Sequence, residues 1–309
     1  MDQAEQLRLL VTKQQEQKKK ERKTSRVITV TSGKGGVGKS TLTVNLAIHL
    51  SRLGKKVIIL DADFGLANIE VMLGIRPEYN LADLMFRGKE LKDIIIQGPE
   101  GIGFISGGSG IQELSRLTRE QVVYLVQKLY ELDELADIIL VDTGAGISDS
   151  VLEFVSASNE VLLVATPEPT SITDAYALLK TLNRRNGFSK DDTIIRMVAN
   201  RIKTKEEGDA LYEKLSLVVE KFLSLKLELV GAIPDDINCG KAIMQQQPIT
   251  LAEPRSASVK AIQSIAEKLV SSTSETDKKG IAGLFSRWMK SLYKKKKPQQ
   301  DQKSDNQKK

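Results

Sequence analysis

The chain has 309 residues, 40% of them hydrophobic, which is enough to bury one sizeable core, so we expect one large α/β domain with tails. Its formal net charge of +6 is carried by two arms, because residues 27–277 hold 27 Lys and Arg against 34 Asp and Glu; an acidic body argues against a grip on duplex nucleic acid. The chain has a single cysteine, which excludes an intramolecular disulfide. It has no run of about 18 apolar residues, which excludes a membrane-spanning helix, and its N-terminus is polar, which excludes a secretory signal. We therefore expect a cytoplasmic protein.

Short β-branched runs alternate with helical patterns through the middle of the chain. Several runs are apolar throughout, as in 138–141, which is typical of strands buried on both faces of a parallel sheet. We predict an α/β fold with a doubly wound, mainly parallel sheet flanked by helices, and ligands at the carboxyl ends of the strands. The predicted strands are Val27–Thr31, Lys56–Leu60, Gly103–Ser106, Ile138–Asp142, Glu160–Thr166, Ile194–Asn200 and Leu229–Pro234, and the predicted helices are 39–53, 118–132, 148–157, 171–186, 206–224 and 256–270.

The first element in chain order is an N-terminal arm over residues 1–25. It opens with the heptapeptide Asp2–Arg8 and continues into a stretch of Gln, Lys and Glu. Residues 13–26 hold seven Lys and Arg against two Glu. By composition the arm is a short helix on a basic tether, and a merely solvated extension is an equal alternative.

A phosphate-binding loop follows the first predicted strand. Residues 32–41 read Ser-Gly-Lys-Gly-Gly-Val-Gly-Lys-Ser-Thr and lead into an amphipathic segment over 42–53. A strand, a glycine-rich turn and a helix in this order let backbone N–H groups close around phosphates at the positive end of the helix. We predict that Lys39 reaches the β- and γ-phosphates and that Ser40 ligates Mg²⁺. The residues assigned to the nucleotide phosphates are Gly33, Lys34, Gly35, Gly36, Val37, Gly38, Lys39, Ser40 and Thr41.

A second lysine, Lys34, lies inside this loop, where an ordinary phosphate-binding loop needs no cation. Within a single copy of the chain it would add little to what Lys39 supplies. A physical use for it is to reach the nucleotide that is bound to a second subunit. We therefore predict a homodimer in the ATP state, in which nucleotide binding and dimerisation are linked.

Carboxylates follow two other predicted strands. Asp61 and Asp63 come directly after the second strand, and both are expected to face the nucleotide because alternate residues share a side there. We assign Asp63 to the attacking water and Asp61 to the metal shell, with capping of the next turn as the alternative role for each. The apolar strand over 138–141 ends at Asp142, which is the Walker B pattern, and Asp142 is expected to hold a Mg²⁺-bound water.

The base pocket is predicted at the ends of the last two strands, where Asn200-Arg201 and Pro234-Asp235 occur. An Asn side chain offers a donor and an acceptor to the adenine edge, with a plain turn residue as the alternative. The sequence Asn-Lys-x-Asp, which guanine-specific phosphate-loop proteins carry, is absent. ATP is therefore favoured over GTP.

The C-terminal arm is divided into a polar linker (271–279), an amphipathic helix (280–297) and a tail rich in Gln and Lys (298–309) that we expect to be disordered. Large apolar residues, including the only Trp of the chain, recur there at helical spacing among many lysines. Such a helix lies on an anionic bilayer, and two of them in an ATP-bound dimer would bind with avidity. The alternatives are a helix docked on the body and a ligand for a partner protein. The residues predicted to face the membrane are Ile281, Leu284, Phe285, Trp288 and Leu292.

The lysine that opens Lys-Gly-Gly-Val-Gly-Lys-Ser, together with Asp-x-Asp-x-Gly at 61–65, resembles the deviant Walker A family of MinD and ParA. The resemblance implies an ATPase domain over residues 26–270 and a dimer in which ATP lies between the two subunits. It also implies slow hydrolysis that a partner stimulates. The segment Thr166–Ser171 is similar to the dimer-facing loop of the family. The roles that the resemblance implies are catalytic for Lys34, Lys39 and Asp63, and toward Mg²⁺ for Ser40, Asp61 and Asp142.

The N-terminal pattern Asp-Gln-Ala-x-x-Leu-Arg resembles the activation segment of the flagellar branch of this family, FlhG (YlxH), and residues 142–148 resemble its Walker B segment. In that branch the segment docks on the flagellar SRP-type GTPase FlhF, and its glutamine stimulates GTP hydrolysis. The resemblance implies an ATPase that sets flagellar number or position from the inner face of the cell membrane, with flagellar basal-body proteins as further candidate partners. The implied partner-binding residues are Asp2, Gln3, Ala4, Leu7 and Arg8, with Gln3 as the active one.

Two other functions stay open at this point. A ParA-type DNA-segregation ATPase would bind DNA nonspecifically, which the acidic body and the Trp-containing tail disfavour, although the lysine arms alone could bind DNA. A MinD-type division-site regulator would have no use for the N-terminal arm. Relatives that carry Fe–S clusters need paired cysteines, whereas this chain has only Cys239. We expect no specific nucleic-acid partner, and we interpret His49 as a packing residue.

Overall fold

The computed structural model describes residues 24–63, 68–108, 119–185, 187–272 and 280–295. These residues form the α/β body and the helix at its C-terminal side. The predicted partner-binding segment Asp2–Arg8 and the predicted tail over 298–309 lie outside the described residues.

An eight-stranded sheet forms the centre of the molecule, with the strand order β3-β4-β2-β5-β1-β6-β7-β8. Neighbouring strands are parallel except for the pair β3 and β4, which confirms the predicted doubly wound, mainly parallel sheet. All seven predicted strands are present, and β3 was not predicted because two residues carry no readable pattern. The strands are β1 (Arg26–Ser32), β2 (Val57–Ala62), β3 (Ile96–Gln97), β4 (Gly103–Ile105), β5 (Ile138–Ala145), β6 (Glu160–Ala165), β7 (Ile194–Ile202) and β8 (Leu227–Pro234).

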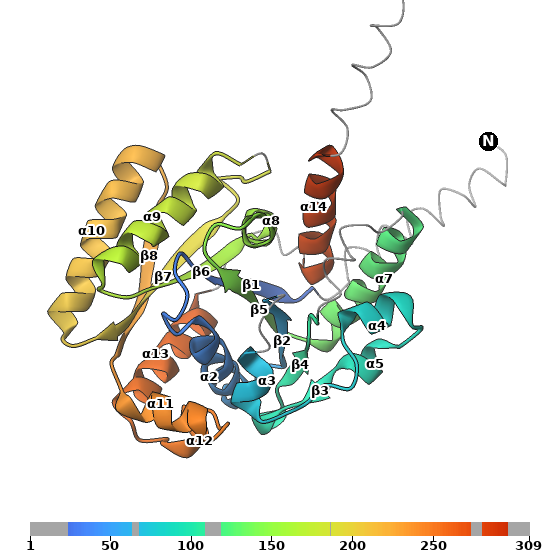
Figure 1. The fold of residues 1–309 in the computed structure, drawn as a ribbon, viewed down its shortest axis with the longest axis horizontal. Coiled ribbons are helices and arrows are strands. Elements are labelled where there is room, and N and C mark those ends of the chain that lie inside the picture. Colours follow the sequence, from blue (N-terminus) through green and yellow to red (C-terminus); the bar gives the residue numbers. More distant parts are fainter. Residues whose placement is uncertain (1–23, 64–67, 109–118, 186, 273–279, 296–309) are drawn as a thin grey trace, which may run out of the picture.

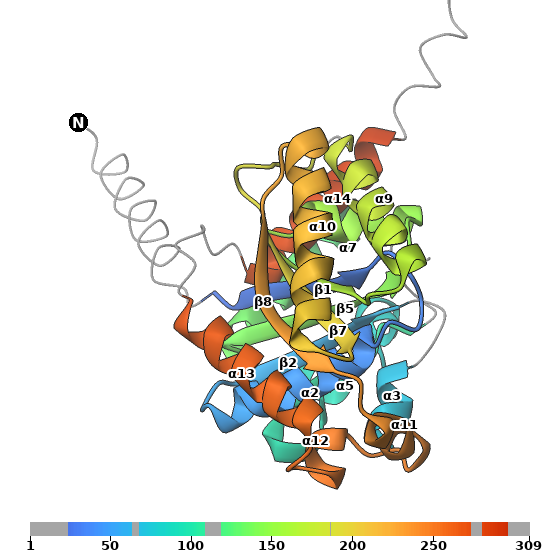
Figure 2. The same ribbon diagram turned by 90° about the vertical axis from the view of Figure 1, so that its left-hand side faces the viewer.

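Helices cover both faces of the sheet (Figure 1). The helices α2 and α13 pack side by side on one face, and α9 and α10 pack side by side on the other, together with α7, α8 and α14 (Figures 1 and 2). The helices are α2 (Lys39–Arg52), α3 (Asn68–Leu73), α4 (Leu81–Phe86), α5 (Leu91–Ile94), η1 (Pro99–Gly101, a 3₁₀ turn), α7 (Arg119–Leu135), α8 (Asp149–Ala157), α9 (Pro169–Asn183), α10 (Lys205–Leu223), α11 (Ile237–Met244), α12 (Ile249–Ala252), α13 (Ala257–Ser271) and α14 (Gly280–Lys295).

The core is split by the sheet into two sides, because successive side chains of a strand point to opposite faces. In β2, Val57 and Ile59 join the core beneath α2 and α13, whereas Ile58 and Leu60 join the core beneath α7 and α14. Strands covered on both faces leave the carboxyl edge of the sheet as the place where polar groups can gather. This is where the functional residues are found.

The short helices were not predicted. Helices α3, α4, α5, α11 and α12 have between four and eight residues, which is too short for an apolar stripe to repeat. Two of them begin at side-chain caps, Asn80 for α4 and Asp236 for α11, each of which accepts a backbone N–H two residues on. Single apolar residues of these helices still join the core, as Ile69 of α3, Leu84 of α4 and Ile94 of α5 do.

The C-terminal helix α14 is docked on the body, where it packs against α7 and α8 (Figure 1). Its apolar stripe is buried: Phe285 is 0% and Trp288 is 3% exposed. Both rings contact Phe154 of α8, with ring centroids 5.6 and 4.6 Å away. The stripe is therefore docked on the body in this structure, as in the alternative named above, and contact of the same residues with a membrane stays a prediction. The buried stripe contains Ile281, Leu284, Phe285, Trp288 and also Met289, while the side chain of Leu292 lies outside the described residues.

The stripe could be misread because an apolar face matches a bilayer and an apolar protein surface equally well. Here the matching surface is supplied by residues of α7 such as Leu125, Leu129 and Leu132. Among the described residues, no helix is long and apolar enough to cross a membrane.

Candidate nucleotide-binding site

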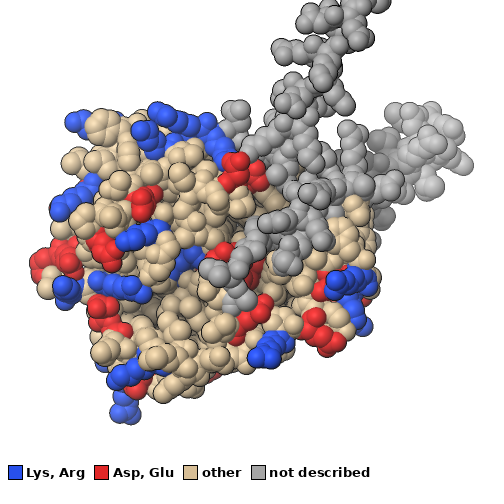
Figure 3. Space-filling model, in the orientation of Figure 1, with Lys and Arg blue, Asp and Glu red and all other residues tan. Residues whose placement is uncertain are grey.

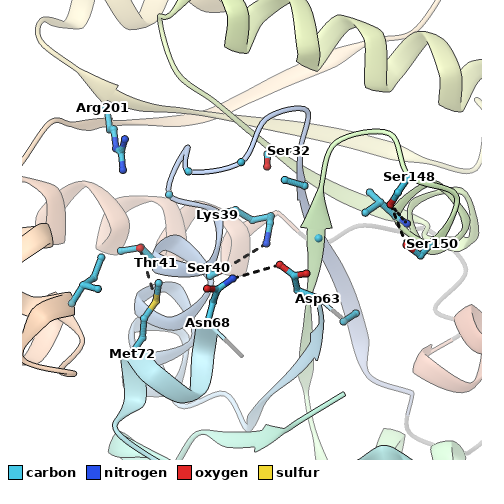
Figure 4. A pocket seen from close by; sticks show the side chains of 18 residues that line it. Ser32, Lys39, Ser40, Thr41, Asp63, Asn68, Met72, Ser148, Ser150 and Arg201 are labelled. Carbon is cyan, nitrogen blue, oxygen red and sulfur yellow. Dashed lines mark hydrogen bonds between the residues drawn. The ribbon is translucent and has the colours of Figure 1, made fainter. Parts of the chain in front are cut away.

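A cleft of about 740 Å³ opens at the carboxyl ends of β1, β2 and β5 (Figure 4). Its volume lies in the range of small-molecule sites. Lys39 and Ser40 reach it from the start of α2, and Asp63 reaches it from the end of β2 (Figure 4). Its lining includes Ser32, Gly35, Gly36, Gly38, Lys39, Ser40, Thr41, Asp63, Asn68, Gly144, Ser148 and Arg201.

The phosphate loop needs glycine at two of its positions. Gly38 has φ +92°, and a Cβ there would overlap the side-chain amide of Asn200. At Gly33 a Cβ would overlap the backbone of Asp174 in α9. The loop therefore fits against β7 and α9 only without side chains at these positions. It delivers the chain into α2, whose first turn holds no acidic residue and whose N-terminus favours an anion.

Three polar groups of α2 converge on Asp142, which is fully buried inside β5, three residues before the end of the strand at Ala145. The Asp142 carboxylate accepts hydrogen bonds from Lys39 Nζ at 3.1 Å and Ser40 Oγ at 2.6 Å. The Thr43 hydroxyl donates to the same carboxylate at 2.9 Å. The structure thus brings the predicted phosphate lysine, the predicted Mg²⁺ ligand and the predicted Walker B carboxylate into one cluster.

Lys34 lies in the same loop and binds the start of α9. Its Nζ is 2.7 Å from Glu168 Oε2 and donates to Thr170 Oγ1 at 2.8 Å. The ammonium group lowers the pKa of the Glu168 carboxyl through this hydrogen bond. Lys34 thus reaches the segment that was predicted to face a second subunit, and contact with a second nucleotide stays a prediction.

The two acids after β2 lie in different surroundings. Asp61 is 4% exposed, and burial raises the pKa of its carboxyl to about 8. The Asp63 carboxylate lines the cleft and accepts from Asn68 Nδ2 at 3.5 Å, while the Asp63 N–H donates to Asp61 Oδ1 at 2.9 Å. Asp63 is therefore placed to touch a water in the cleft, as the predicted role requires. Asp61 is more deeply buried, and a nearby divalent cation would favour its charged carboxylate.

The predicted base pocket is a second cavity of about 290 Å³ beside the cleft. It is lined by all four predicted residues, Asn200, Arg201, Pro234 and Asp235. The Asn200 Nδ2, however, donates to the Val37 carbonyl at 2.7 Å, so the side chain holds the phosphate loop. The sequence did not indicate this second role, because a contact between residues so far apart in the chain carries no local signal. Contact of the Asn200 amide with the adenine edge stays a prediction. Arg201 has φ +56° and lines both cavities.

The side chains present fit a nucleotide with Mg²⁺. Ser40 and the carboxylates Asp61 and Asp142 supply the oxygen ligands that Mg²⁺ prefers, and Ser40 and Asp142 contact the tip of Lys39. When bound, Mg²⁺ neutralises charge on the β- and γ-phosphate oxygens. The Lys39 ammonium and the backbone N–H groups of the loop would both donate hydrogen bonds to the phosphates of ATP.

Sequence reasoning missed several residues of the site. Thr43 lies one helical turn after Lys39, and this spacing was the available signal for a third donor to Asp142. Asn68 and Met72 enter the cleft from α3, where no motif was recognised. Ser148 and Ser150 enter from the start of α8; Ser148 closes the segment 142–148 that resembles a Walker B segment, but neither serine was given a role. None of the described residues of α14 lines the cleft, because α14 lies across the sheet from α2.

Comparison with known proteins agrees with this site. The ParA family model, described as NUBPL iron-transfer P-loop NTPase, matches residues 23–270. The chain is 44% identical to the antiactivator FleN of Pseudomonas aeruginosa over 79% of this chain and 85% of that one. It is 36% identical to the flagellum site-determining protein YlxH of Helicobacter pylori over 87% of this chain and 91% of the relative.

A solved structure shows the same fold with a nucleotide. The septum site-determining protein MinD of Pyrococcus horikoshii, complexed with Mg-ADP, superposes with a TM-score of 0.61 at 25% identity, covering 79% of this chain and 96% of that one. ATP and Mg²⁺ are accordingly the cofactors of the site. With the phosphate loop, its second lysine and the Walker B carboxylate in place, this chain belongs to the ParA/MinD family of P-loop ATPases.

Proposed function

We propose that this ATPase regulates the number or placement of flagella from the inner face of the cell membrane. The observation that carries the proposal is the 36% identity to the flagellum site-determining protein YlxH over 87% of the chain. The 44% identity to the antiactivator FleN and the N-terminal pattern over Asp2–Arg8 support the same branch of the family. ATP binding, dimerisation and membrane residence are the steps through which it acts.

ATP closes a homodimer in this proposal, and Lys34 contributes to the nucleotide of the second subunit. The side chain is 36% exposed and is held by Glu168 and Thr170 at the surface. An exposed ion pair of this kind is worth about 0–1 kcal/mol, so a phosphate group can replace it.

Light scattering tests this step on the Asp63→Ala variant, alone and combined with Lys34→Ala, each with ATP and with ADP. A dimer that forms with ATP and that Lys34→Ala weakens supports the proposal. Equal mass in all four samples contradicts it.

Membrane association requires α14 to leave the body, because its apolar stripe is buried there. Two features of the docked helix support reversible docking. The buried Trp288 Nε1 has no hydrogen-bond partner among the described residues, which costs about 1–3 kcal/mol, and Trp N–H groups find partners readily at a membrane interface. Burial also lowers the pKa of the Arg287 guanidinium, so its charge is better solvated when the helix is free.

Co-sedimentation with anionic vesicles tests the membrane step. The full chain and a chain that ends at residue 277 are compared in ATP and in ADP. Binding that needs both ATP and the helix supports the proposal. Binding of neither chain in either nucleotide contradicts it.

The N-terminal arm stimulates the SRP-type GTPase FlhF through Gln3 in this proposal, on the strength of its sequence pattern. GTP turnover by FlhF is measured with this chain added, and then with the Gln3→Ala variant. The matched control is Gln6→Ala, which changes a neighbouring glutamine outside the implied set. Loss of stimulation with Gln3→Ala alone supports the role, and equal stimulation by both variants contradicts it.

The function as a whole is tested by deleting the gene in the source organism and counting flagella per cell by electron microscopy. Wild type, Asp63→Ala and a chain lacking residues 2–23 are then returned. An altered count that only wild type restores supports the proposal. An unaltered count would move a DNA-segregation function to the front. On the face seen in Figure 3, the basic and acidic side chains of the described residues are interspersed, which does not favour that rival.

A further inference from the structure

One buried carboxylate, Asp133 of α7, joins three segments of the chain. It is 1% exposed. Its Oδ1 accepts the Ile281 N–H at 2.7 Å and its Oδ2 accepts the Ala282 N–H at 3.3 Å. The Ser25 hydroxyl donates to the same carboxylate. Ser25 directly precedes β1 and lies at the root of the N-terminal arm, whereas Ile281 and Ala282 open α14.

The start of α14 is shaped around this carboxylate. The first N–H groups of a helix have no partner within the helix, and a negative charge at that end is favourable. Asp133 supplies both from another helix. Gly280 has φ +61°, and a Cβ there would overlap the Asp133 carboxylate, so the approach is possible only for glycine. The docking of α14 is thus fixed by a specific polar contact as well as by apolar packing.

A second polar contact holds α14 near its middle, at Arg287. The Arg287 Nε donates to the Ala157 carbonyl at 2.7 Å, and its guanidinium also donates to Asn159 Oδ1. These partners lie at the end of α8 and just beyond it, away from α7. Arg287 therefore offers a way to loosen α14 without touching Asp133.

We propose that Asp133 is a latch that couples the two arms of the chain. The carboxylate is oriented by donors from both arms at once, so removing one donor leaves a buried, partly unsatisfied charge and weakens its hold on the other. A protein that pulls on the N-terminal arm and displaces Ser25 favours the release of α14. By linkage, release of α14 loosens the root of the N-terminal arm to the same extent in free energy.

The proposal rests on the proposed function, because it assigns partner binding to the N-terminal arm and membrane binding to α14. It adds that the two are not independent. A membrane-bound molecule then presents a loosened N-terminal arm, and a partner-bound molecule reaches the membrane more easily.

The single Trp of the chain makes the latch measurable without membranes or partners. Trp288 is 3% exposed when α14 is docked, so acrylamide quenching of its fluorescence reports release. In Asp133→Asn, one carboxylate oxygen becomes a donor that faces backbone N–H groups. We expect the docking equilibrium to shift by roughly tenfold toward release, with a smaller shift in the same direction for Ser25→Ala.

The matched control is Asp83→Asn. Asp83 is a buried carboxylate, 2% exposed, that accepts the Asn80 N–H at 2.9 Å at the start of its own helix α4. The control should leave Trp288 quenching unchanged, and far-UV circular dichroism verifies that each variant is folded. Unchanged quenching in folded Asp133→Asn overturns the latch.

The coupling itself is tested from the other arm. In Arg287→Ala, α14 is loosened at a point remote from Asp133, and hydrogen exchange is followed in the peptide that contains Ser25 and Arg26. Faster exchange there supports the coupling, and unchanged exchange with a released Trp288 overturns it. Vesicle binding by Asp133→Asn in ATP is measured separately: release seen by fluorescence without vesicle binding in ATP contradicts the proposed function and leaves the latch standing.

Discussion

The nucleotide cleft and the docking face of α14 belong to different parts of one sheet and are held by different forces. In the cleft, Lys39, Ser40 and Thr43 are joined to the fully buried Asp142 by hydrogen bonds of 2.6 to 3.1 Å. On the docking face, apolar side chains and three aromatic rings carry the contact, with polar anchors at Asp133 and Arg287. Polar networks fix one geometry, whereas apolar faces accept several partners of similar shape. The cleft is therefore suited to a defined reaction and the docking face to a reversible contact.

The largest effect is expected from Asp63→Ala, which tests whether the cleft separates binding from chemistry. Asp63 lines the cleft from the end of β2, whereas the donors to Asp142 come from α2, so ATP binding should persist while turnover falls about 100-fold or more. ATP turnover and the affinity for a fluorescent nucleotide are measured on the same sample. Normal turnover would refute the assignment of Asp63 to the attacking water.

The contrast between an integral core and a detachable helix is tested by two phenylalanines that touch each other. Phe154 belongs to α8 and Phe285 to α14, and both are at most 1% exposed. We expect Phe154→Ala to lower the free energy of unfolding of the body by about 3–5 kcal/mol. Phe285→Ala should lower the free energy of unfolding by less. Because α14 can leave the body while the body stays folded, the variant can lose no more than the free energy with which α14 docks.

Urea unfolding followed by circular dichroism gives the first quantity, and quenching of Trp288 follows the second. Equal losses of unfolding free energy in the two variants would show that α14 is part of the core. That result would remove the distinction between the two regions.

A smaller effect concerns pH and the helix α2 that carries the cleft. His49 of α2 is 4% exposed, and burial lowers its pKa to about 4. Between that value and the pKa of about 6.5 of an unfolded chain, only the unfolded state takes up the proton. The stabilising contribution of neutral His49 is thus complete above pH 6.5 and falls by about 2 kcal/mol on going from pH 7 to pH 5.

Comparison with His49→Gln isolates this contribution. The raised pKa of Asp61 acts in the opposite direction, since stability from that group falls as pH rises, but it is present in both proteins and cancels. The stability difference between wild type and variant, from urea unfolding, should therefore shrink at pH 5. A difference that does not change with pH would contradict the buried, neutral histidine.

The smallest effect sharpens the account of the cleft. Thr43→Val keeps the shape of the side chain and removes its hydrogen bond to Asp142, so the carboxylate is less firmly oriented. We expect the nucleotide affinity measured with Mg²⁺ to fall about tenfold in Thr43→Val and to return in Thr43→Ser, which keeps the hydroxyl. The Mg²⁺ dependence of fluorescent-nucleotide affinity measures this. The control Thr29→Val removes a buried hydroxyl that bonds Ser158, and an equal loss there would show a merely structural role.

The sheet and the centre of the cleft were predictable because their signals are local. Apolar strands that end in acids and a contiguous glycine-rich loop place Lys39, Ser40 and Asp142 without knowledge of the rest of the chain. The bond between Asn200 and Val37 joins residues from distant segments, and the short helices around the cleft carry no periodic pattern. The docking of α14 escaped prediction for another reason, since its stripe specifies an apolar partner but not which one.

The contact between Gly33 and α9 has a consequence for how the molecule transmits nucleotide binding. Because Gly33 has no side chain, the phosphate loop rests directly on the backbone of Asp174 and Ala175. Main-chain contact of this kind leaves no rotamer that could absorb a displacement. A shift of the phosphate loop on nucleotide binding would therefore be passed directly to α9, which has Glu168 and Thr170 at its start. A single methyl group added at Gly33 would force the phosphate loop away from the backbone of α9.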